Sequence, residues 1–182
     1  MRKLTSIMGL ILATASWSAT GDTAADLVIA EWQSQQVLYS EYGPLLTMET
    51  GLSERGIPLK LKFTLKNIDD GRQTIFFPKE RESIARSIYI VNGRSTYFRP
   101  REPANRFPIM ELFDEFVMEP GEETVWEFDV EDLVSDFSAY TEATGFLRIS
   151  FGSLLYLDRD GDAEDLVDYE RLRERLSWNG TL

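Results

Sequence analysis

The chain has 182 residues, 43% of them hydrophobic, a formal charge of −12, and neither cysteine nor histidine. These counts predict a folded globule without disulfides, and they exclude Ser-His-Asp or Cys-His catalysis and imidazole-bound zinc, copper or iron. The negative charge repels nucleic acid and anionic lipid, so neither is an expected partner.

The first residues have the features of a secretory signal peptide. Arg2 and Lys3 form a positive end, residues 4–12 are mainly apolar, and small residues follow. This order predicts a signal peptide over residues 1–19. The alternative, a retained membrane anchor, is disfavoured because the apolar stretch is short for a bilayer span.

Cleavage fits best after Ala15 and next best after Ser18. We therefore expect a periplasmic or secreted protein with no stable membrane insertion after cleavage. Residues 20–182 have a suitable length for one domain with a substantial core.

Alternation of apolar and polar residues predicts a series of short strands. It is clearest over Leu59–Lys66, where Leu59, Leu61, Phe63 and Leu65 would face the core and the lysines would face water. Two further runs alternate clearly. In one, Trp126, Phe128 and Val130 face inward; in the other, which follows Gly145, Leu147, Ile149 and Phe151 face inward and alternate with Arg148 and Ser150. The remaining predicted strands are Leu27–Gln33 and Gln36–Tyr42 at an edge, Gln73–Phe77, Ser87–Val91, Arg94–Phe98, Glu111–Met118 and a last strand around Ser177–Leu182.

Turn residues separate these runs. Asn67–Gly71 is a turn cluster, and Asn92-Gly93 predicts a two-residue type I′ hairpin because both positions of that turn need positive φ. Pro120 and Gly121 fit the central positions of a type II turn over Glu119–Glu122. Short strands at this spacing predict an all-β fold, an antiparallel immunoglobulin-like β-sandwich.

Two segments suggest helix. Residues 132–137 fit either one helical turn or a loop that crosses between sheets. Over Asp162–Leu176 apolar residues recur at helical spacing, with carboxylates near the start and arginines near the end, as the helix macrodipole favours. The sequence therefore predicts one short C-terminal helix.

Charge is unevenly distributed along the chain. Residues 55–106 contain twelve basic and five acidic side chains, whereas residues 107–147 contain twelve carboxylates and no lysine or arginine. The favoured interpretation is that basic residues of one strand pair with acidic residues of its neighbour. The alternative is a bipolar surface that steers a charged partner.

An acidic stretch near the C-terminus is the most ligand-like part of the sequence. Its candidate calcium ligands are Asp158, Asp160, Asp162 and Asp165. Ala163 stands where an EF-hand loop needs glycine, and Tyr169 where it needs glutamate. A solvated helix cap is the favoured interpretation, so the sequence predicts no cofactor. A bound calcium ion is the alternative.

A second segment, Arg99–Pro108, has three prolines and three arginines in ten residues. Proline restricts the loop and arginine suits interface contacts, so this loop is the candidate partner-binding segment. The residues assigned to that contact are Arg99, Arg101, Arg106 and Phe107. An ordinary rigid crossover between sheets is the alternative.

Carboxylates over Glu111–Asp136 could supply a glycosidase-like pair, but their abundance makes any chosen pair unspecific. Trp32, Trp126 and Trp178 could stack on sugar rings. Trp126 is in phase with inward-facing residues, which favours the core for it.

The order of the signals resembles that of bacterial exported immunoglobulin-like β-sandwich domains, a group that includes proteinase-inhibitor-like domains. Within residues 55–152 the resemblance is carried by the Leu59–Asn67 strand, the Asn92-Gly93 hairpin, Met118–Glu122 before an aromatic strand, and Thr144–Arg148. None of these motifs is catalytic, so the resemblance implies a binding or accessory module and transfers no site residue.

The sequence therefore predicts an exported, non-enzymatic module that binds a protein partner, in the manner of an inhibitor or an assembly accessory. The alternative is a carbohydrate-binding or carboxylate-dependent glycan-hydrolysing domain.

Overall fold

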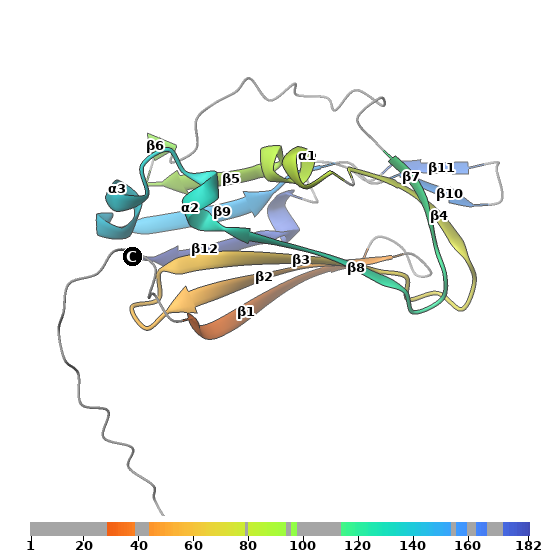
Figure 1. Ribbon diagram of the computed structural model, residues 1–182, viewed down its shortest axis with the longest axis horizontal. Coiled ribbons are helices and arrows are strands. Elements are labelled where there is room, and N and C mark those ends of the chain that lie inside the picture. Colours follow the sequence, from red (N-terminus) through yellow and green to blue (C-terminus); the bar gives the residue numbers. More distant parts are fainter. Residues whose placement is uncertain are drawn as a thin grey trace, which may run out of the picture.

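The computed structural model describes residues 29–38, 44–78, 80–93, 96–97, 114–153, 156–159, 163–166 and 173–182. In this part of the chain the protein is all-β: every strand pair is antiparallel and the helices are short. Figure 1 shows strands in two facing layers. The predicted signal peptide, residues 1–19, lies outside the described residues.

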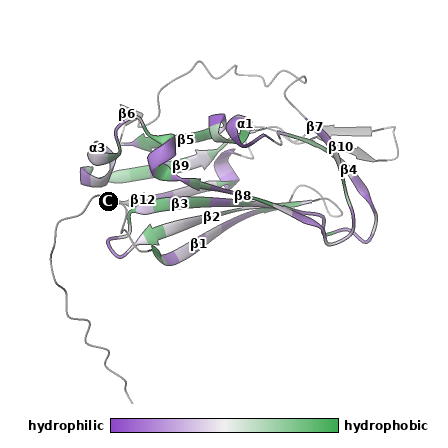
Figure 2. Ribbon diagram, viewed as in Figure 1, coloured by the Kyte–Doolittle hydropathy of each residue, from purple (hydrophilic) through white to green (hydrophobic). Residues whose placement is uncertain are grey.

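Sheet A forms one layer and confirms the clearest sequence pattern. In sheet order its strands are β1 (Ile29–Leu38), β2 (Leu45–Ser53), β3 (Pro58–Lys66) and β8 (Glu123–Asp129). In β3, Leu59, Leu61, Phe63 and Leu65 are buried, and the half-buried Lys60, Lys62, Thr64 and Lys66 alternate with them on the outer face. Figure 2 shows the corresponding mixture of hydrophobic and hydrophilic residues along these strands.

The first part of sheet A corrects the sequence prediction. The separate edge strands predicted over Leu27–Gln33 and Gln36–Tyr42 are wrong, because Ile29–Leu38 forms one unbroken strand. Its middle residues pair in continuous register with β2, which supplies the hydrogen-bonding partner that a break would lose. The strand β2 itself was not predicted.

The other layer contains two half-sheets. Sheet C has the order β12 (Ser177–Thr181), β9 (Phe146–Phe151), β5 (Ile88–Asn92) and β6 (Thr96–Tyr97). Sheet B has the order β11 (Ala163–Leu166), β10 (Tyr156–Arg159), β4 (Gln73–Phe77) and β7 (Asp114–Met118). The predicted strand Gln73–Phe77 and the predicted last strand are confirmed.

The β5–β6 hairpin is confirmed, but its two-residue type I′ turn is wrong. Asn92 stays within β5, where it pairs with Thr96 of β6 and with Leu147 of β9. Asn92 therefore cannot be a central residue of a two-residue turn, whereas Gly93 has the predicted positive φ, at 58°. Pairing with strands on both sides holds Asn92 in extended conformation.

The predicted helix over Asp162–Leu176 is wrong in its first part. Residues 163–166 are strand β11, which pairs with β10, and β10 pairs in turn with β4. Sheet hydrogen bonding therefore prevails over the helical periodicity. Residues 167–172 lie outside the described part, and residues 173–175 form a single helical turn before β12.

That helical turn explains an unexpected burial on sheet C. Ser150 was predicted to alternate outward with Arg148, yet it is 1% exposed. Its register partners are Tyr89 and Ser177. The Arg173 guanidinium lies 5.1 Å from the Tyr89 ring centroid, and the Ser177 hydroxyl donates to the Arg173 carbonyl. The turn thus covers this part of the outer face.

Three short helices join the strands: α1 (Arg81–Arg86), α2 (Val130–Leu133) and α3 (Phe137–Glu142). Residues 132–137, predicted as one helical turn or a crossing loop, therefore contain the end of α2, a short connection and the start of α3. Val130 is buried as predicted, although it begins α2 instead of ending β8. No helix in the described ranges is long and apolar enough to cross a bilayer.

A corner links sheets A and B. The ribbon of β3 and β8 bends there and returns as β4 and β7, at one end of the molecule in Figure 1. Buried Asn67 holds the bend, because its side-chain amide donates to the carbonyls of Gly71 (2.8 Å) and Met118 (3.1 Å). The side-chain oxygen of Asn67 accepts from the backbone N–H of Asp69 (3.0 Å).

The turns at this corner agree with the sequence. The N–H of Glu122 donates to the carbonyl of Glu119 at 3.0 Å, and Gly121 has a φ of 78°, as a type II turn requires. Hydrogen bonds from Asp70, with its side chain contributing most, and from Gln73 lower the pKa of Asp69.

One hydrophobic core fills the space between the layers. The Phe63 and Phe151 ring centroids, from sheets A and C, lie 4.8 Å apart, and Phe77 of sheet B lies 5.6 Å from Trp126. Tyr140 of α3 closes one end, where its hydroxyl donates to the carbonyl of Pro58 at 2.7 Å. Burial raises the pKa of Tyr140.

Candidate functional site

The predicted partner-contact residues, Arg99, Arg101, Arg106 and Phe107, lie outside the described residues. The contact loop over Arg99–Pro108 therefore stays a prediction.

The predicted calcium ligands are only partly described. Asp160 and Asp162 lie outside the described part, and Asp158 and Asp165 belong to the β10–β11 hairpin. The hairpin replaces the helix start for which a solvated acidic cap was expected. Within the described ranges, no group of three or more acidic residues could hold a metal ion. The calcium site also stays a prediction.

The three tryptophans in the described residues differ in exposure. Trp126 is 8% exposed in the core, as its phase predicted, and Trp178 is 4% exposed. The Trp178 indole donates to the Gln33 side-chain oxygen at 2.7 Å, which ties β12 to the inner side of β1. Trp32 is 41% exposed. Of these three rings, only that of Trp32 is therefore available to a ligand.

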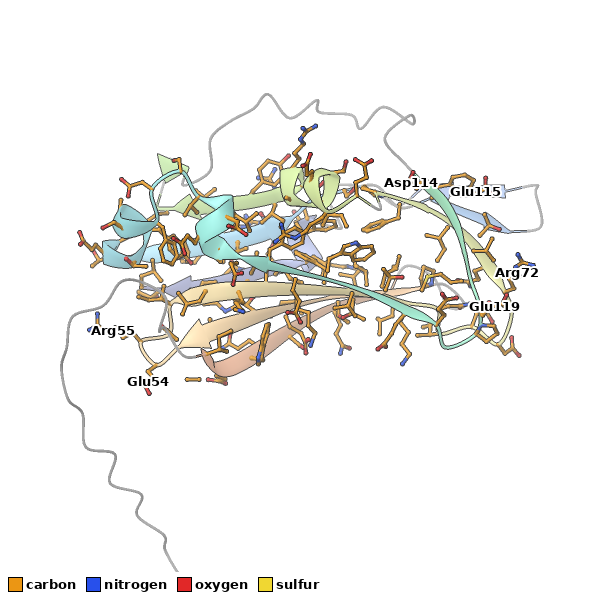
Figure 3. The ribbon with its side chains drawn as sticks, viewed as in Figure 1. Glu54, Arg55, Arg72, Asp114, Glu115 and Glu119 are labelled. Atoms are coloured by element: carbon orange, nitrogen blue, oxygen red, sulfur yellow. The ribbon has the colours of Figure 1, made fainter. Side chains whose placement is uncertain are left out.

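Ion pairs join the basic and acidic segments, as cross-strand complementarity predicted. The pairs are Lys60–Asp129 (3.4 Å), Lys66–Glu123 (3.6 Å), Arg81–Asp132 (3.5 Å) and, at the corner, Arg72–Glu119 (3.7 Å; Figure 3). These side chains are 44–67% exposed, so each pair contributes about 0–1 kcal/mol. The uneven charge along the sequence is therefore partly neutralised by the fold.

The outer face of sheet A is a polar surface built from alternate residues of its four strands. The register aligns Ser34, Glu49, Lys62 and Glu127 in one row across the sheet, and Gln36, Thr47, Thr64 and Val125 in the next. These two rows, with Leu45, Lys66 and Glu123, line an open hollow of about 450 Å³.

Trp32 stands beside this hollow in a defined position. It lies across from Gly51, where a Cβ atom would come within 3.3 Å of the indole, so the missing side chain makes room for the ring. The Lys62 ammonium lies 5.3 Å from the ring centroid and forms an ion pair with Glu49. The Ser34 hydroxyl donates to the same carboxylate at 3.2 Å. The indole therefore belongs to an ordered polar cluster.

The two edges of sheet A are treated differently. On β8, the Glu127 carbonyl accepts from the Arg81 guanidinium at 3.4 Å, and this guanidinium also lies 4.9 Å from the Phe128 ring centroid. Arg81 thus holds the start of α1 against the edge of β8. On β1, the described part of the chain pairs with one side only, that of β2.

Sequence reasoning missed this surface because it missed β2. The signal was present: Leu46, Met48, Thr50 and Leu52 alternate with polar or small residues, and all four are buried. The signal is weak because a threonine occupies one inward position and glycine follows it.

Comparison of the chain with protein-family models, with curated proteins and with solved structures gives no match.

Proposed function

We propose that the chain is an exported, immunoglobulin-like binding module that takes up an extended, basic segment of a partner protein at the outer edge of β1. The signal-like first residues support export. The strand orders support the immunoglobulin-like arrangement, in which one sheet has the order A-B-E and the other G-F-C-C′. Strands β2, β3 and β8 correspond to the first order, and β12, β9, β5 and β6 to the second.

The position of Tyr140 gives further support for this arrangement, although its hydrogen bond differs. It lies in the connection between the strands at positions E and F, where immunoglobulin-like domains carry a tyrosine whose hydroxyl bonds to backbone a few residues upstream. Here the acceptor is the carbonyl of Pro58, at the start of the strand at position B. The connection is thus fastened to the opposite layer.

The edge of β1 is the observation that carries the binding proposal. Proteins usually protect sheet edges with proline, lysine, inward charges, bulges or a covering segment. Arg81 protects β8, whereas β1 has ten residues, one charge at Glu31, no proline and no lysine. Its register with β2 is regular after a single shift between Ile29 and Glu31. No other strand of the described residues pairs with this edge, and such an edge offers its backbone groups to an added strand.

Charge indicates the chemistry of the occupant. The chain carries a net charge of −12, and Glu31 is exposed on the edge strand. A basic segment is attracted to this field, whereas a second copy of the chain carries the same negative charge and is repelled. A partner strand of net positive charge is therefore favoured over self-pairing.

A proline scan at Ser34 and Gln35 tests this proposal. Adjacent residues of an antiparallel edge strand direct their N–H groups to opposite sides, so one of the two prolines removes a bond to β2 and the other blocks only the outer edge. The variant that loses stability carries the proline that removes a bond to β2, and the other variant carries the proline that blocks only the outer edge. Ten-residue peptides selected by phage display on the wild type supply the ligand.

The selected peptides should be basic, and the proline that leaves stability unchanged should weaken their binding at least tenfold. Equal binding to the wild type and to that variant would refute the proposal, as would selection of acidic peptides.

A further inference from the structure

The hollow lies on the outer face of sheet A, whereas the proposed peptide contact uses the backbone groups along the edge of β1. It has a volume of about 450 Å³ and is open to solvent. It spans all four strands, and its central lining residues, on β2 and β3, are positioned by backbone pairing on both sides.

The charges in this hollow favour a neutral ligand. Its charged lining residues are two lysines and three glutamates, and Lys62 pairs with Glu49 as Lys66 pairs with Glu123. An anion would meet three carboxylates, and a cation would have to compete with lysines that are already in place. A neutral polar molecule bonds to these groups without breaking the pairs.

The polar uncharged lining residues, which lie beside the apolar Leu45 and Val125, favour a ligand rich in hydroxyl groups. Ser34, Gln36, Thr47 and Thr64 come from three neighbouring strands. The hydroxyls of Ser34 and Thr47 already donate to the Glu49 carboxylate and the Thr64 carbonyl and so offer acceptors, whereas the Gln36 amide offers donors and an acceptor. Neighbouring strands lie ~4.8 Å apart, so a rigid ring with several hydroxyls can bond to two strands at once.

Trp32 adds a flat apolar surface next to these polar groups. The ring is 41% exposed and is positioned by Gly51 and Lys62 before any ligand arrives. A preorganised aromatic side chain loses little conformational entropy on binding. The C–H face of a sugar ring matches such an indole, since it is apolar while its rim carries hydroxyls.

We propose that this face of sheet A binds a neutral saccharide, with one sugar ring stacked on Trp32 and the hydroxyls of the chain bonded across the two polar rows. The proposal does not depend on the edge of β1.

Affinity electrophoresis and calorimetry with soluble polysaccharides test it. The neutral probes are a β-glucan, a mannan and a dextran, and the anionic probe is polygalacturonate. At least one neutral probe should bind, and Trp32→Ala should weaken its binding at least tenfold. The matched control is Ile68→Ala, which truncates another exposed apolar side chain, 43% exposed, at the corner; it should bind within twofold of wild type.

A second variant keeps the test valid if Trp32→Ala disturbs folding. The double change Thr47→Val and Thr64→Val removes hydroxyls from the hollow but preserves side-chain shape and strand preference. It should retain the melting temperature and weaken binding at least fivefold.

Three results would overturn the saccharide proposal: no neutral probe binds, polygalacturonate binds at least as tightly, or the variants bind like wild type. Failure of the edge proposal leaves these measurements unaffected.

Discussion

Tyr140 shows how one buried side chain fixes the end of the sandwich. Its ring packs against Phe137 with centroids 5.9 Å apart, and its hydroxyl reaches the Pro58 carbonyl across the core. Because the phenol is fully buried, its ionised form is strongly disfavoured in the folded state, and the pKa of Tyr140 is raised. This residue therefore links stability to alkaline pH.

The variant Tyr140→Phe should be less stable than wild type by about 1–3 kcal/mol at pH 7, because the Pro58 carbonyl loses its donor. The raised pKa contributes stability that is complete below pH 10.0, the ordinary tyrosine value, and is lost as the pH rises toward the folded-state value. The gap between the two proteins should narrow by about 1.4 kcal/mol per pH unit above that point.

Urea unfolding of both proteins at about pH 7, 10 and 11, below, at and above the ordinary tyrosine pKa of ~10, measures the difference in their free energies of unfolding. The remaining tyrosines are common to both proteins, so their titration cancels in the difference. A gap that stays constant from neutral to alkaline pH would contradict the assigned burial.

At the same scale, the sequence predicted core residues better than surface ones. Phe63, Trp126 and Phe128 were placed inward by alternation alone. Trp178 could not be assigned, since its burial depends on the inner side of β1 and on Gly180, whose missing side chain leaves space for the indole. Such contacts join distant parts of the chain and leave no local pattern.

At the scale of elements, local patterns succeeded where each strand carries its own signal. The pattern over Leu59–Lys66 corresponds to β3 within one residue, and Gln73–Phe77 is β4. Prediction from local patterns failed over residues 163–166, where apolar spacing suggested a helix but pairing with β10 gives a strand. A partner 4 to 10 residues away in the chain decided that element, and the helical period could not reveal it.

The protection of β8 by α1 is a property of elements that can be tested directly. Arg81→Ala removes the donor to the Glu127 carbonyl and the ion pair with Asp132. The change should cost less than about 1 kcal/mol in stability, because the pair is exposed. It should, however, expose the β8 edge and let the selected basic peptides pair with it.

Calorimetric titration with the selected basic peptides, which counts the peptides bound per chain, measures this effect. The control is Arg55→Ala, which truncates an exposed arginine in the β2–β3 turn, at the other end of the sheet from the corner (Figure 3). If Arg81→Ala binds no more peptide per chain than the control, the guanidinium does not protect the edge.

At the scale of the whole molecule, the antiparallel all-β class was predictable and the site was not. Alternation and turn residues report which side chains face a core, but they do not state which strand is at an edge. That β1 pairs with one strand among the described residues, and that Arg81 contacts the edge of β8, follows only from the strand order and from the contacts of Arg81. The hollow beside Trp32 likewise requires the register of four strands.

Amide hydrogen exchange along β1, resolved by NMR, tests most directly whether its outer edge is open to a partner strand. In the free protein, protection should alternate from residue to residue between Glu31 and Leu38, since within the described part of the chain β1 pairs with β2 on one side. The unprotected amides should become protected when a selected basic peptide is added. Uniform protection of β1 in the free protein, or no change on adding the peptide, would contradict the account.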